Sequence, residues 1–349
     1  MTDELDPITI AGGGLAGLSL GIGLRSRGFP VSVIESGNYP RHRVCGEFIS
    51  GVTPADLEKL AVPDLLNDAV ANRTTSWHTD SHCFFESELP SPAMGISRFA
   101  LDQILADQFL SAGGKLQTGT RFLLSESKTE GTVLAIGRPR RTHSNWIGLK
   151  AHLRNFEFHS DLEMHLGNGG YLGISRVENG IANACGLFKV QKSIKASKTE
   201  LLLAYLEKSG LSKLAKRIRI TEIVPESCLG VNAFELGHQL PKTPTEPDQM
   251  MLGDQFAIIG PFTGNGMSMA FQSAAVAVDP LVAYAKKEIG WAECCLEVND
   301  ELATKFRKRL GMSRLLHPFL TGGAQQKLLV MLGENNLLPF SLLFRHLRT

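Results

Sequence analysis

Apolar and polar residues follow different patterns in successive parts of this chain. Short apolar runs at 8–11 and 31–34 flank a glycine-rich turn and an apolar stretch, an order that predicts strand, helix and strand. Apolar residues at helical spacing then predict helices over 53–66, 99–110 and 199–218. Strands and helices in this order are typical of the α/β class.

Between residues 146 and 188 the pattern changes to short runs in which apolar and polar residues alternate. Glycine-containing turn sequences at 168–170 and 178–180 separate these runs, and the combination predicts an antiparallel meander. The predicted strands cover 147–153, 162–166, 171–176 and 181–188. A short buried strand returns at about Met250, so the meander is expected to interrupt the α/β domain.

The glycine-rich turn after the first strand has the spacing of a dinucleotide site. Gly12, Gly14 and Gly17 fit G-x-G-x-x-G, in which the glycines permit a sharp turn, the approach of a pyrophosphate and close helix–strand packing. Glu35 ends the second strand, where a carboxylate can accept hydrogen bonds from ribose hydroxyls. A packing turn with an incidental glutamate is the alternative, but strand, spacing and acid together favour a dinucleotide.

A second glycine-rich segment lies far downstream. A short apolar strand ends in Gly253-Asp254, and a loop leads to Gly264-Asn265-Gly266-Met267 at the start of a helix with many small residues. An acid after a strand can bind a sugar or ribityl hydroxyl. The N–H groups at a helix start can bind an anionic or electron-rich ring edge.

This downstream segment resembles the G-D-A-A-x-x-x-x-P-x-x-G-x-G flavin motif of the para-hydroxybenzoate-hydroxylase-like FAD superfamily. Residues 39–47 resemble the Y-P-R-x-K-x-C-G-E segment of its geranylgeranyl-reductase-like flavoproteins, and residues 97–105 resemble the superfamily's R-x-x-L/F-D-x-x-L helix. The matches follow the family order over roughly residues 8–275. The resemblance therefore implies FAD as the tightly held cofactor.

The resemblance also assigns residues to the cofactor. It implies that Asp254 binds the ribityl or pyrophosphate part and that Gly264, Asn265, Gly266 and Met267 line the pyrimidine edge of the flavin. It places Arg43 and Arg98 near the phosphate and ribityl groups, where guanidinium groups suit a buried diphosphate. The alternative for Arg98 is a helix-surface ion pair with Asp102. The remaining expected cofactor contacts are Gly12, Gly14, Leu15, Ala16, Gly17, Glu35, Ser36, Cys45, Gly46 and Gly137.

The implied fold is a Rossmann-like FAD-binding domain of the α/β class, interrupted by an antiparallel β-sheet substrate domain and followed by a helical C-terminal segment. The FAD-binding domain is expected over 1–75, 95–141 and 246–290, the substrate domain over 76–94 and 142–245, and the helical segment over 291–349. The last segment combines leucine-rich stretches with basic residues expected to be exposed, namely Lys305, Arg307, Lys308 and Arg309. Such a tail packs on its own domain or, alternatively, contacts a membrane surface.

Composition adds limits on partners and location. Lys plus Arg (36) nearly balances Asp plus Glu (35), so no nucleic-acid partner is expected. The acidic N-terminus predicts no secretory signal, and six cysteines without paired spacing favour free thiols in the cytoplasm. His78 and His82 are four residues apart without a cysteine or carboxylate at ligand spacing, so no metal site is expected.

Departures from the family patterns bear on the reaction. The stretch ending in Gly137 lacks the aspartate of the Asp-Gly motif through which FAD and NADPH share a site in aromatic hydroxylases, so the electron donor is either NAD(P)H or a separate reductase protein. Cys45 resembles the cysteine that the prenyl reductases place near the flavin and is the candidate catalytic residue; a small buried residue is the alternative. Basic neighbours at 41–43 predict a lowered thiol pKa for Cys45.

The function predicted from these features is an FAD-dependent oxidoreductase acting on a hydrophobic small molecule. A monooxygenase that hydroxylates an aromatic or polyketide-like compound is the first choice. The tryptophan-containing W-x-W-x-I-P element of the halogenases and the Y-x-W-x-F-P element of the archaeal prenyl reductases are both missing. A C=C reductase of an isoprenoid-like substrate is the first alternative, and a non-enzymatic flavin-binding carrier is the second.

Overall fold

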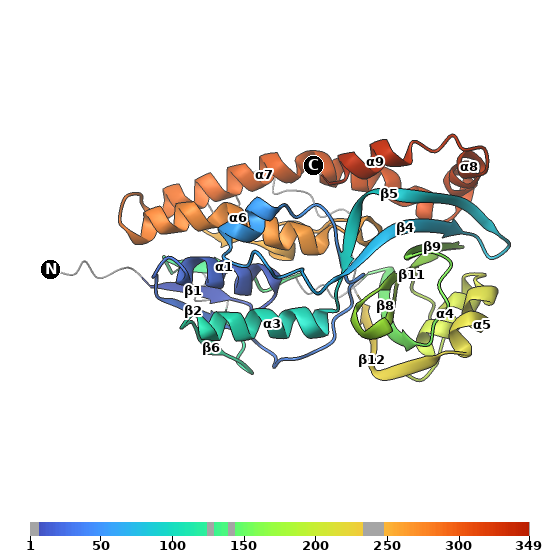
Figure 1. The fold of residues 1–349 in the computed structure, drawn as a ribbon, viewed down its shortest axis with the longest axis horizontal. Coiled ribbons are helices and arrows are strands. Elements are labelled where there is room, and N and C mark those ends of the chain that lie inside the picture. The colour runs from blue at the N-terminus through green and yellow to red at the C-terminus, as the bar shows by residue number, and fades with distance from the viewer. Residues whose placement is uncertain (1–6, 124–128, 139–143, 233–247, 349) are drawn as a thin grey trace.

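A computed structural model describes residues 7–123, 129–138, 144–232 and 248–348. Within these ranges the chain forms two sheets, one at each end of an elongated molecule, with the C-terminal helices along one side of both (Figure 1). The strand–helix–strand order predicted at the N-terminus is present. It consists of β1 (Ile8–Ala11), α1 (Leu15–Arg25) and β2 (Val31–Ile34).

The first sheet is parallel and has the strand order β13-β7-β1-β2-β6. Its further strands are β6 (Lys115–Gln117), β7 (Thr132–Leu134) and β13 (Met250–Met251). Helices α3 (Arg98–Ser111) and α6 (Gly266–Ala285) both pack on α1. Strand residues such as Ile8, Ile10 and Val133 are fully buried because helices cover the sheet, as is usual for parallel sheets.

The second sheet has eight strands in the order β12-β8-β11-β10-β9-β4-β5-β3. The strands are β3 (Phe48–Ile49), β4 (Val70–His78), β5 (Cys83–Gly95), β8 (Trp146–Arg154), β9 (Leu162–Gly167), β10 (Gly170–Arg176), β11 (Ala182–Lys189) and β12 (Glu222–Asn232). All four strands predicted between 146 and 188 are present. The sheet is mixed rather than antiparallel, however, because β4 and β9 pair in parallel. The chain leaves this sheet after β5 and returns at β8, so a long crossover and not a tight turn brings β4 beside β9.

Three predicted boundaries differ in detail. The domain boundary predicted between 75 and 76 falls inside β4, and β3 already pairs with β5 of the second sheet. The helix predicted over 53–66 is the shorter α2 (Pro54–Lys59). The helix predicted over 199–218 is divided into α4 (Leu201–Lys208) and α5 (Ser212–Arg219) by Gly210, whose φ of +77° is incompatible with a continuous right-handed helix.

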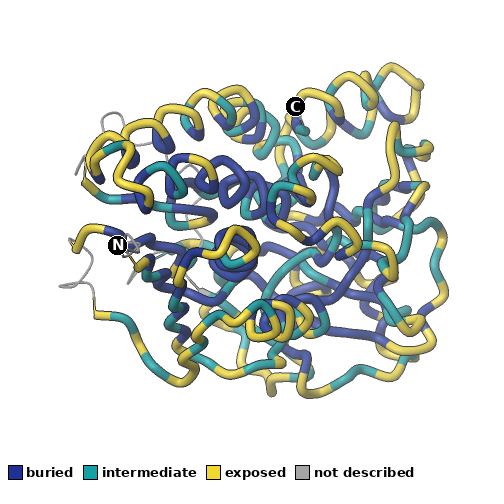
Figure 2. The backbone as a smooth tube through the Cα atoms, turned by 60° about the vertical axis from the view of Figure 1, so that its left-hand side comes forward, coloured by how far each residue is buried: buried dark blue, intermediate teal, exposed yellow. Residues whose placement is uncertain are grey.

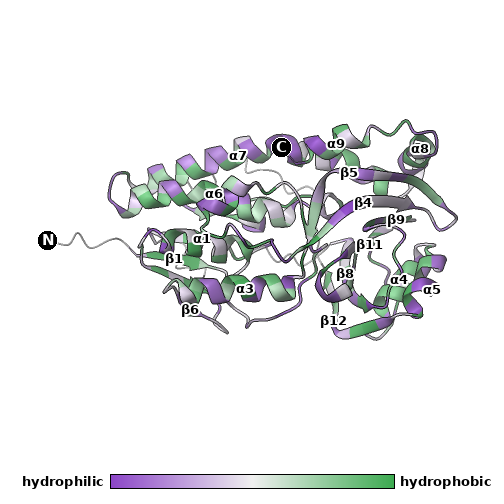
Figure 3. Cartoon of the chain, viewed as in Figure 1, coloured by the Kyte–Doolittle hydropathy of each residue, from purple (hydrophilic) through white to green (hydrophobic). Residues whose placement is uncertain are grey.

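The C-terminal segment forms α7 (Trp291–Leu316), α8 (Gly323–Glu334) and α9 (Phe340–His346). Helix α7 packs on α6, whereas α8 and α9 contact β5 of the second sheet, so this segment bridges the two halves (Figure 1). Figure 2 shows that the inner faces of these helices are buried and their outer faces exposed, and in Figure 3 the hydrophobic and hydrophilic stripes of α7 alternate accordingly. None of the helices in the described ranges has the length and apolar character needed to cross a bilayer.

One residue of this segment contradicts the sequence prediction. Arg309 was expected to be exposed with its basic neighbours, but it is 1% exposed. Phe306, Arg309 and Ser313 recur at helical spacing on the inner face of α7, so the helix turns this guanidinium toward the interior.

Gly17 allows α1 to lie directly against the turn that follows β1. A Cβ at this position would lie 1.9 Å from the carbonyl oxygen of Gly12, a backbone atom that cannot rotate away. We therefore expect Gly17→Ala to lower the free energy of unfolding by roughly 1–3 kcal/mol or more through overpacking, measured by urea denaturation. Gly311→Ala is the control, because a Cβ there meets no atom within 4 Å on exposed α7. It should stabilise by about 0.5–1 kcal/mol. An equal effect of both substitutions would contradict the close packing.

Candidate functional site

The turn before α1 leaves space for an anion at the start of the helix. Gly12 has a φ of +107°, and a Cβ there would lie 2.2 Å from the carbonyl oxygen of Ala135. Gly14 is the N-cap of α1, makes no side-chain cap, and would place a Cβ where no atom lies within 4 Å. The N–H groups of Leu15 and Ala16 therefore open into free space at the positive end of the helix, which suits a pyrophosphate.

Glu35 lies at the end of β2 and is buried, with 4% exposed. Its Oε1 accepts hydrogen bonds from Ser36, from the Gly37 backbone N–H and from Arg41, and its Oε2 accepts one from the Gly13 backbone N–H. Burial raises the pKa of Glu35, but Arg41 and the Gly37 N–H more than offset this, so its pKa is below the usual value. Oε2 has room for one more donor, such as a ribose hydroxyl.

The two predicted arginines lie together but differ in what they offer. Arg98 forms a two-point ion pair with Asp102, at 2.7 and 2.9 Å, and Arg43 donates to the same carboxylate at 2.9 Å. The alternative for Arg98 is thus observed, except that the pair is buried and not on a helix surface. The Nη2 of Arg43 is buried without a hydrogen-bond partner. Because buried N–H groups rarely lack an acceptor, Arg43 is the arginine that fits a phosphate.

Asp254 reaches the same region from the other side of α1. It lies in the 3-10 turn Gly253–Gln255, and a Cβ on Gly253 would be 3.4 Å from the Cβ of Ala16. Its carboxylate is exposed and makes no hydrogen bond within the described ranges. Burial raises the pKa of Asp254, and the charges of Arg138 and Arg98 oppose this. This accessible carboxylate, the start of α1 and Arg43 outline the candidate dinucleotide site, which we call the cleft. Arg138, which follows Gly137 there, was not predicted.

The start of α6 provides the second group of free N–H donors. Gly264 has a φ of +66°, Asn265 is the N-cap without a capping side chain, and a Cβ on Gly266 would meet nothing within 4 Å. Ser50 and Ser268 exchange hydrogen bonds of 3.3 and 2.7 Å, which join the end of β3 to α6 next to Met267. These predicted residues are therefore brought to one side of the cleft.

Phe48, the first residue of β3, packs against this loop. Its ring is so close to Gly264 that a Cβ there would lie 2.1 Å from the Cε2 of Phe48. The phosphate and sugar positions of a dinucleotide thus fit the residues as they stand. The half-buried Phe48 ring occupies the space beside Gly264, so a flat ring system can bind there only if this side chain moves away. Phe48 can do so by rotating about χ1 to another staggered position.

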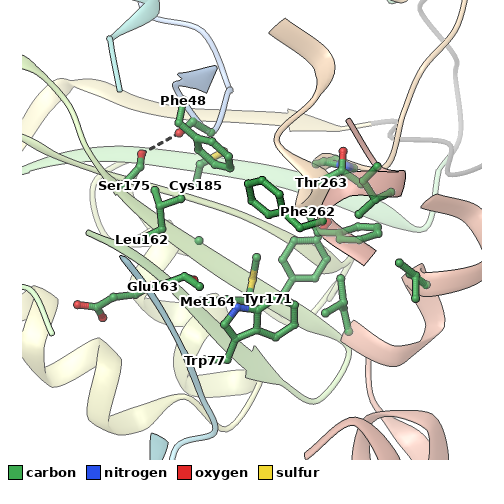
Figure 4. Close-up of a pocket in the computed structure, with 18 of the residues that line it drawn as sticks. Phe48, Trp77, Leu162, Glu163, Met164, Tyr171, Ser175, Cys185, Phe262 and Thr263 are labelled. Carbon is green, nitrogen blue, oxygen red and sulfur yellow. Dashed lines mark hydrogen bonds between the residues drawn. The ribbon is translucent and has the colours of Figure 1, made fainter. Parts of the chain in front are cut away.

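A cavity of about 330 Å³ adjoins this point (Figure 4). Its walls come from β9, β10 and β11 of the second sheet, from the turn Pro261–Thr263 and from α8 and α9. The lining is predominantly apolar and includes Phe48, Trp77, Met164, Tyr171, Phe262, Leu329, Leu343 and Phe344. Of the residues lining this cavity, the sequence pointed only to Cys45 and Gly46, as neighbours of the cofactor, because the walls are contributed by segments from all parts of the chain. The C-terminal helices, expected to pack on the domain or contact a membrane, form one wall.

Cys45 lines the cavity together with Cys185. Its predicted position near the flavin stays a prediction. The predicted lowering of its pKa is wrong. Burial raises the pKa of the Cys45 thiol, and Glu47 adds to this, against the effect of Arg98. The basic neighbours do not act on the thiol because Arg41 pairs with Glu35 and Arg43 pairs with Asp102.

A buried ion pair beside Cys45 was missed by sequence analysis. Both oxygens of the Glu47 carboxylate are used: Oε1 accepts from Lys150 Nζ at 2.5 Å and from the Arg98 N–H at 2.9 Å, and Oε2 is 2.6 Å from His152 Nε2. Glu47 and Lys150 are 0% and 1% exposed, and Glu47 adopts a φ of +55° that favours glycine. Burial raises the pKa of Glu47, but His152 and Lys150 lower it below the usual value overall. The available signal was two polar residues, Lys150 and His152, on one face of an apolar strand.

A second polar cluster lies where the paired strands β4 and β9 end. His78 and His165 are paired in register with stacked rings, and Glu163 brings the ligand atoms of all three within 4.8 Å of one another. Both oxygens of Glu163, however, already accept hydrogen bonds from Arg217. The prediction that the protein has no metal site was based on His78 and His82 alone, and the structure does not test it.

No protein-family model and no curated protein matches this sequence. Solved structures match over most of the chain. A p-nitrophenol 4-monooxygenase from Pseudomonas putida has a TM-score of 0.74 at 12% identity, covering 99% of this chain and 99% of that one. A flavin-dependent brominase has a TM-score of 0.73 at 16% identity, covering 99% and 93%. A geranylgeranyl bacteriochlorophyll reductase-like protein from Thermoplasma acidophilum has 0.73 at 16%, covering 95% and 91%. The fold predicted from the superfamily resemblance is confirmed.

Gly14→Val tests the anion position. Its side chain would fill the free space before α1 without touching other atoms, so we expect loss of bound FAD with less than about 1 kcal/mol change in stability. Visible absorbance of the purified protein and flavin released on denaturation measure the occupancy. Gly290→Val is the matched control, an N-cap of similar extended backbone with nothing within 4 Å, and it should retain FAD. Full flavin occupancy in Gly14→Val would contradict the assignment.

Lys150→Met tests the buried ion pair. It leaves the Glu47 carboxylate buried without its cation, so we expect the free energy of unfolding to fall by about 3–5 kcal/mol. The double variant Glu47→Gln with Lys150→Met should lose less, because no charge remains unpaired. Arg154→Met, on the same strand, removes an exposed pair with Glu222 and should cost about 0–1 kcal/mol. Urea denaturation measures all three. Equal losses in the single and double variants would show that packing alone is responsible.

Proposed function

We propose that this protein is an FAD-dependent oxidoreductase acting on an apolar small molecule. The observation that carries the proposal is the position of the apolar cavity. It begins where the dinucleotide cleft ends, and Cys45, Gly46 and Phe48 contribute to its wall. Its volume of about 330 Å³ is at the small end of the range of ligand pockets, about 300–1,000 Å³.

Each group of residues has a separate task in this proposal. The start of α1 and Arg43 hold the pyrophosphate, Glu35 accepts a ribose hydroxyl, and Asp254 accepts a ribityl hydroxyl. The N–H groups of Met267 and its neighbours at the start of α6 stabilise negative charge on the pyrimidine edge. FAD, when bound, supplies hydride transfer and reaction with O2. The apolar walls hold the substrate and keep water away from the reacting centre.

Hydroxylation is the reaction that we favour. The compact cavity is lined by aromatic side chains, including Trp77, Tyr171 and Phe262, which suits an aromatic or polyketide-like substrate. The comparison with a p-nitrophenol 4-monooxygenase of the same fold over nearly the whole chain also supports a monooxygenase.

Reduction of a C=C bond in an isoprenoid-like substrate is the second candidate. Cys45 supports it because this cysteine lines the cavity and resembles the cysteine that the prenyl reductases place near the flavin. The thiol is protonated at neutral pH because burial raises its pKa, so it could donate a proton and not act as a thiolate. A flavin-binding carrier without enzymatic activity is a third candidate, and the enclosed substrate cavity argues against it.

For the electron donor we propose either NAD(P)H or a separate reductase protein. The surface for any contact with a membrane is formed by the exposed apolar residues Leu328 and Met331 of α8, Leu342 of α9 and Leu337 between these helices. All six cysteines are free thiols, which fits the proposed cytoplasmic location.

The mass of the product separates these reactions. We expect the protein, given FAD, an electron donor and isotopically heavy O2, to convert a compact apolar aromatic compound into a product with one heavy oxygen atom. Mass spectrometry measures this, with the flavin-free Gly14→Val variant as the control. A product that gains two hydrogen atoms and no oxygen would instead support the reductase. Bound FAD without turnover of aromatic or isoprenoid compounds would contradict both reactions.

A further inference from the structure

Two arginines lie close together at one end of the cavity: Arg348, which is partly exposed and lines it, and Arg309, which is buried behind it. Within the described ranges neither forms an ion pair with a carboxylate. Arg309 is 1% exposed and donates to Gln272 Oε1 at 2.8 Å and to the backbone carbonyl of Arg348 at 2.9 Å. Its Nε is buried without a partner. Asp56 is the acid whose charge acts on Arg309, but it caps α2 through Thr53 and forms no ion pair with Arg309.

Arg348 presents the second charge to the cavity. Its guanidinium lies 3.3 Å above the centroid of the Phe344 ring, its Nε donates to Ser50 Oγ, and the residue forms part of the cavity lining. The two Nη groups make no hydrogen bond within the described ranges. Burial and the charge of Arg309 lower the pKa of Arg348 to about 9, so the group is still protonated at neutral pH.

Hydrogen bonds to two backbone carbonyls hold the segment that carries Arg348 in place. Asn265, the N-cap of α6, donates to the carbonyl of Leu347 at 2.7 Å, and Arg309 donates to the carbonyl of Arg348. The end of the chain is therefore attached to α6 and α7 immediately beside Gly51, whose Cβ would lie 3.2 Å from the Arg348 carbonyl oxygen. This attachment holds a cation beside the predicted position of the flavin.

The rest of the cavity offers nothing that neutralises this charge. Glu163 is the other charged residue of the lining. Its side chain is fully buried and paired with Arg217, and Figure 4 shows its carboxylate directed away from Trp77 and Met164. A ligand in this cavity therefore contacts an apolar surface and one cation, Arg348, at the end formed by the residues after α9.

We infer that the cavity binds an apolar molecule that carries an anionic group, with Arg348 as the residue that recognises the anion. Arg348 is a partly buried cation whose two Nη groups have no acceptor within the described ranges, and a guanidinium suits a two-point interaction with a carboxylate or sulfonate. Arg309 stands behind Arg348 and adds positive potential. The inference rests on the proposed function in that this cavity is taken as the substrate site, and it selects acidic over neutral apolar substrates.

Two fluorescent dyes with the same ring skeleton test the inference. The probe 8-anilinonaphthalene-1-sulfonate carries an anion, whereas N-phenyl-1-naphthylamine is neutral. Binding of both is titrated by fluorescence to the full-length protein with saturating FAD, so that the dinucleotide cleft is closed to the dyes. The variants are Arg348→Met, Arg348→Lys and, as a control, Arg314→Met, which removes an exposed cation of α7 outside the cavity lining. Flavin content and thermal unfolding are measured for each variant.

We expect Arg348→Met to weaken the sulfonate dye by about tenfold or more, while the neutral dye changes by less than about twofold. Arg348→Lys should recover part of the sulfonate affinity, and Arg314→Met should leave both affinities unchanged. Equal weakening of both dyes would make Arg348 a packing residue and overturn the inference. Loss of flavin with unchanged dye affinities would assign Arg348 to the cofactor and overturn it as well.

The same experiment separates this inference from the proposed function. If the wild-type protein retains no flavin but still prefers the sulfonate dye through Arg348, the anion site stands and the FAD assignment fails. If flavin is bound and Arg348→Met has no selective effect, the FAD assignment stands and the anion site fails.

Discussion

The buried carboxylate of Glu47 is the interaction on which the arrangement of the two halves depends. It accepts hydrogen bonds from the first residue of α3 in the dinucleotide half and from Lys150 and His152 on β8 of the second sheet. Breaking such a pair costs about 3–5 kcal/mol, a large part of the stability of an ordinary domain, about 5–15 kcal/mol. The segment that carries Glu47 also carries Cys45, Gly46 and Phe48. One network thus joins the two sheets beside the apolar cavity.

The cleft itself is formed by close approach of backbone atoms. Gly17 and Gly12 let α1 lie against the end of the parallel sheet, while Gly253 lets the Asp254 turn approach Ala16 from the other side. A side chain at Gly17 would push α1 away from the turn, and one at Gly12 would collide with the Ala135 backbone, whereas a Cβ on Gly253 would only touch Ala16. Because α1 and α6 also pack on one another, their N-terminal ends are fixed relative to each other. The distance between the phosphate position and the ring position therefore follows from helix packing and not from flexible loops.

The C-terminal helices complete the site and do not simply cover the fold. Helices α8 and α9 close the cavity with leucine and phenylalanine side chains, and the residues after α9 attach to Asn265 and Arg309. These hydrogen bonds offset the burial of Arg309 only in part, since its Nε has no partner and Asp56, the acid whose charge acts on it, forms no ion pair with it. An anion recognised by Arg348 would reduce this unfavourable charge. Stability of the tail and selectivity of the cavity are thus coupled through the same two guanidinium groups.

Features that depend on residues close together in the chain could be predicted from the sequence. Glycine spacing and the strand and helix periodicities were sufficient for the α/β fold and for the interrupting sheet, while the cofactor contacts assigned from the resemblance stay predictions. Which charges meet depends on the folded chain. Glu47 and Lys150 are 103 positions apart, and Asn265 and the C-terminal backbone are 82 apart. The parallel β4–β9 pair, the buried side of Arg309 and the raised pKa of Cys45 likewise depend on such distant neighbours. The spacing of residues along the chain does not say which distant residues come into contact. Burial and electrostatic potential depend on all neighbours of a residue, and only the folded chain brings those neighbours together.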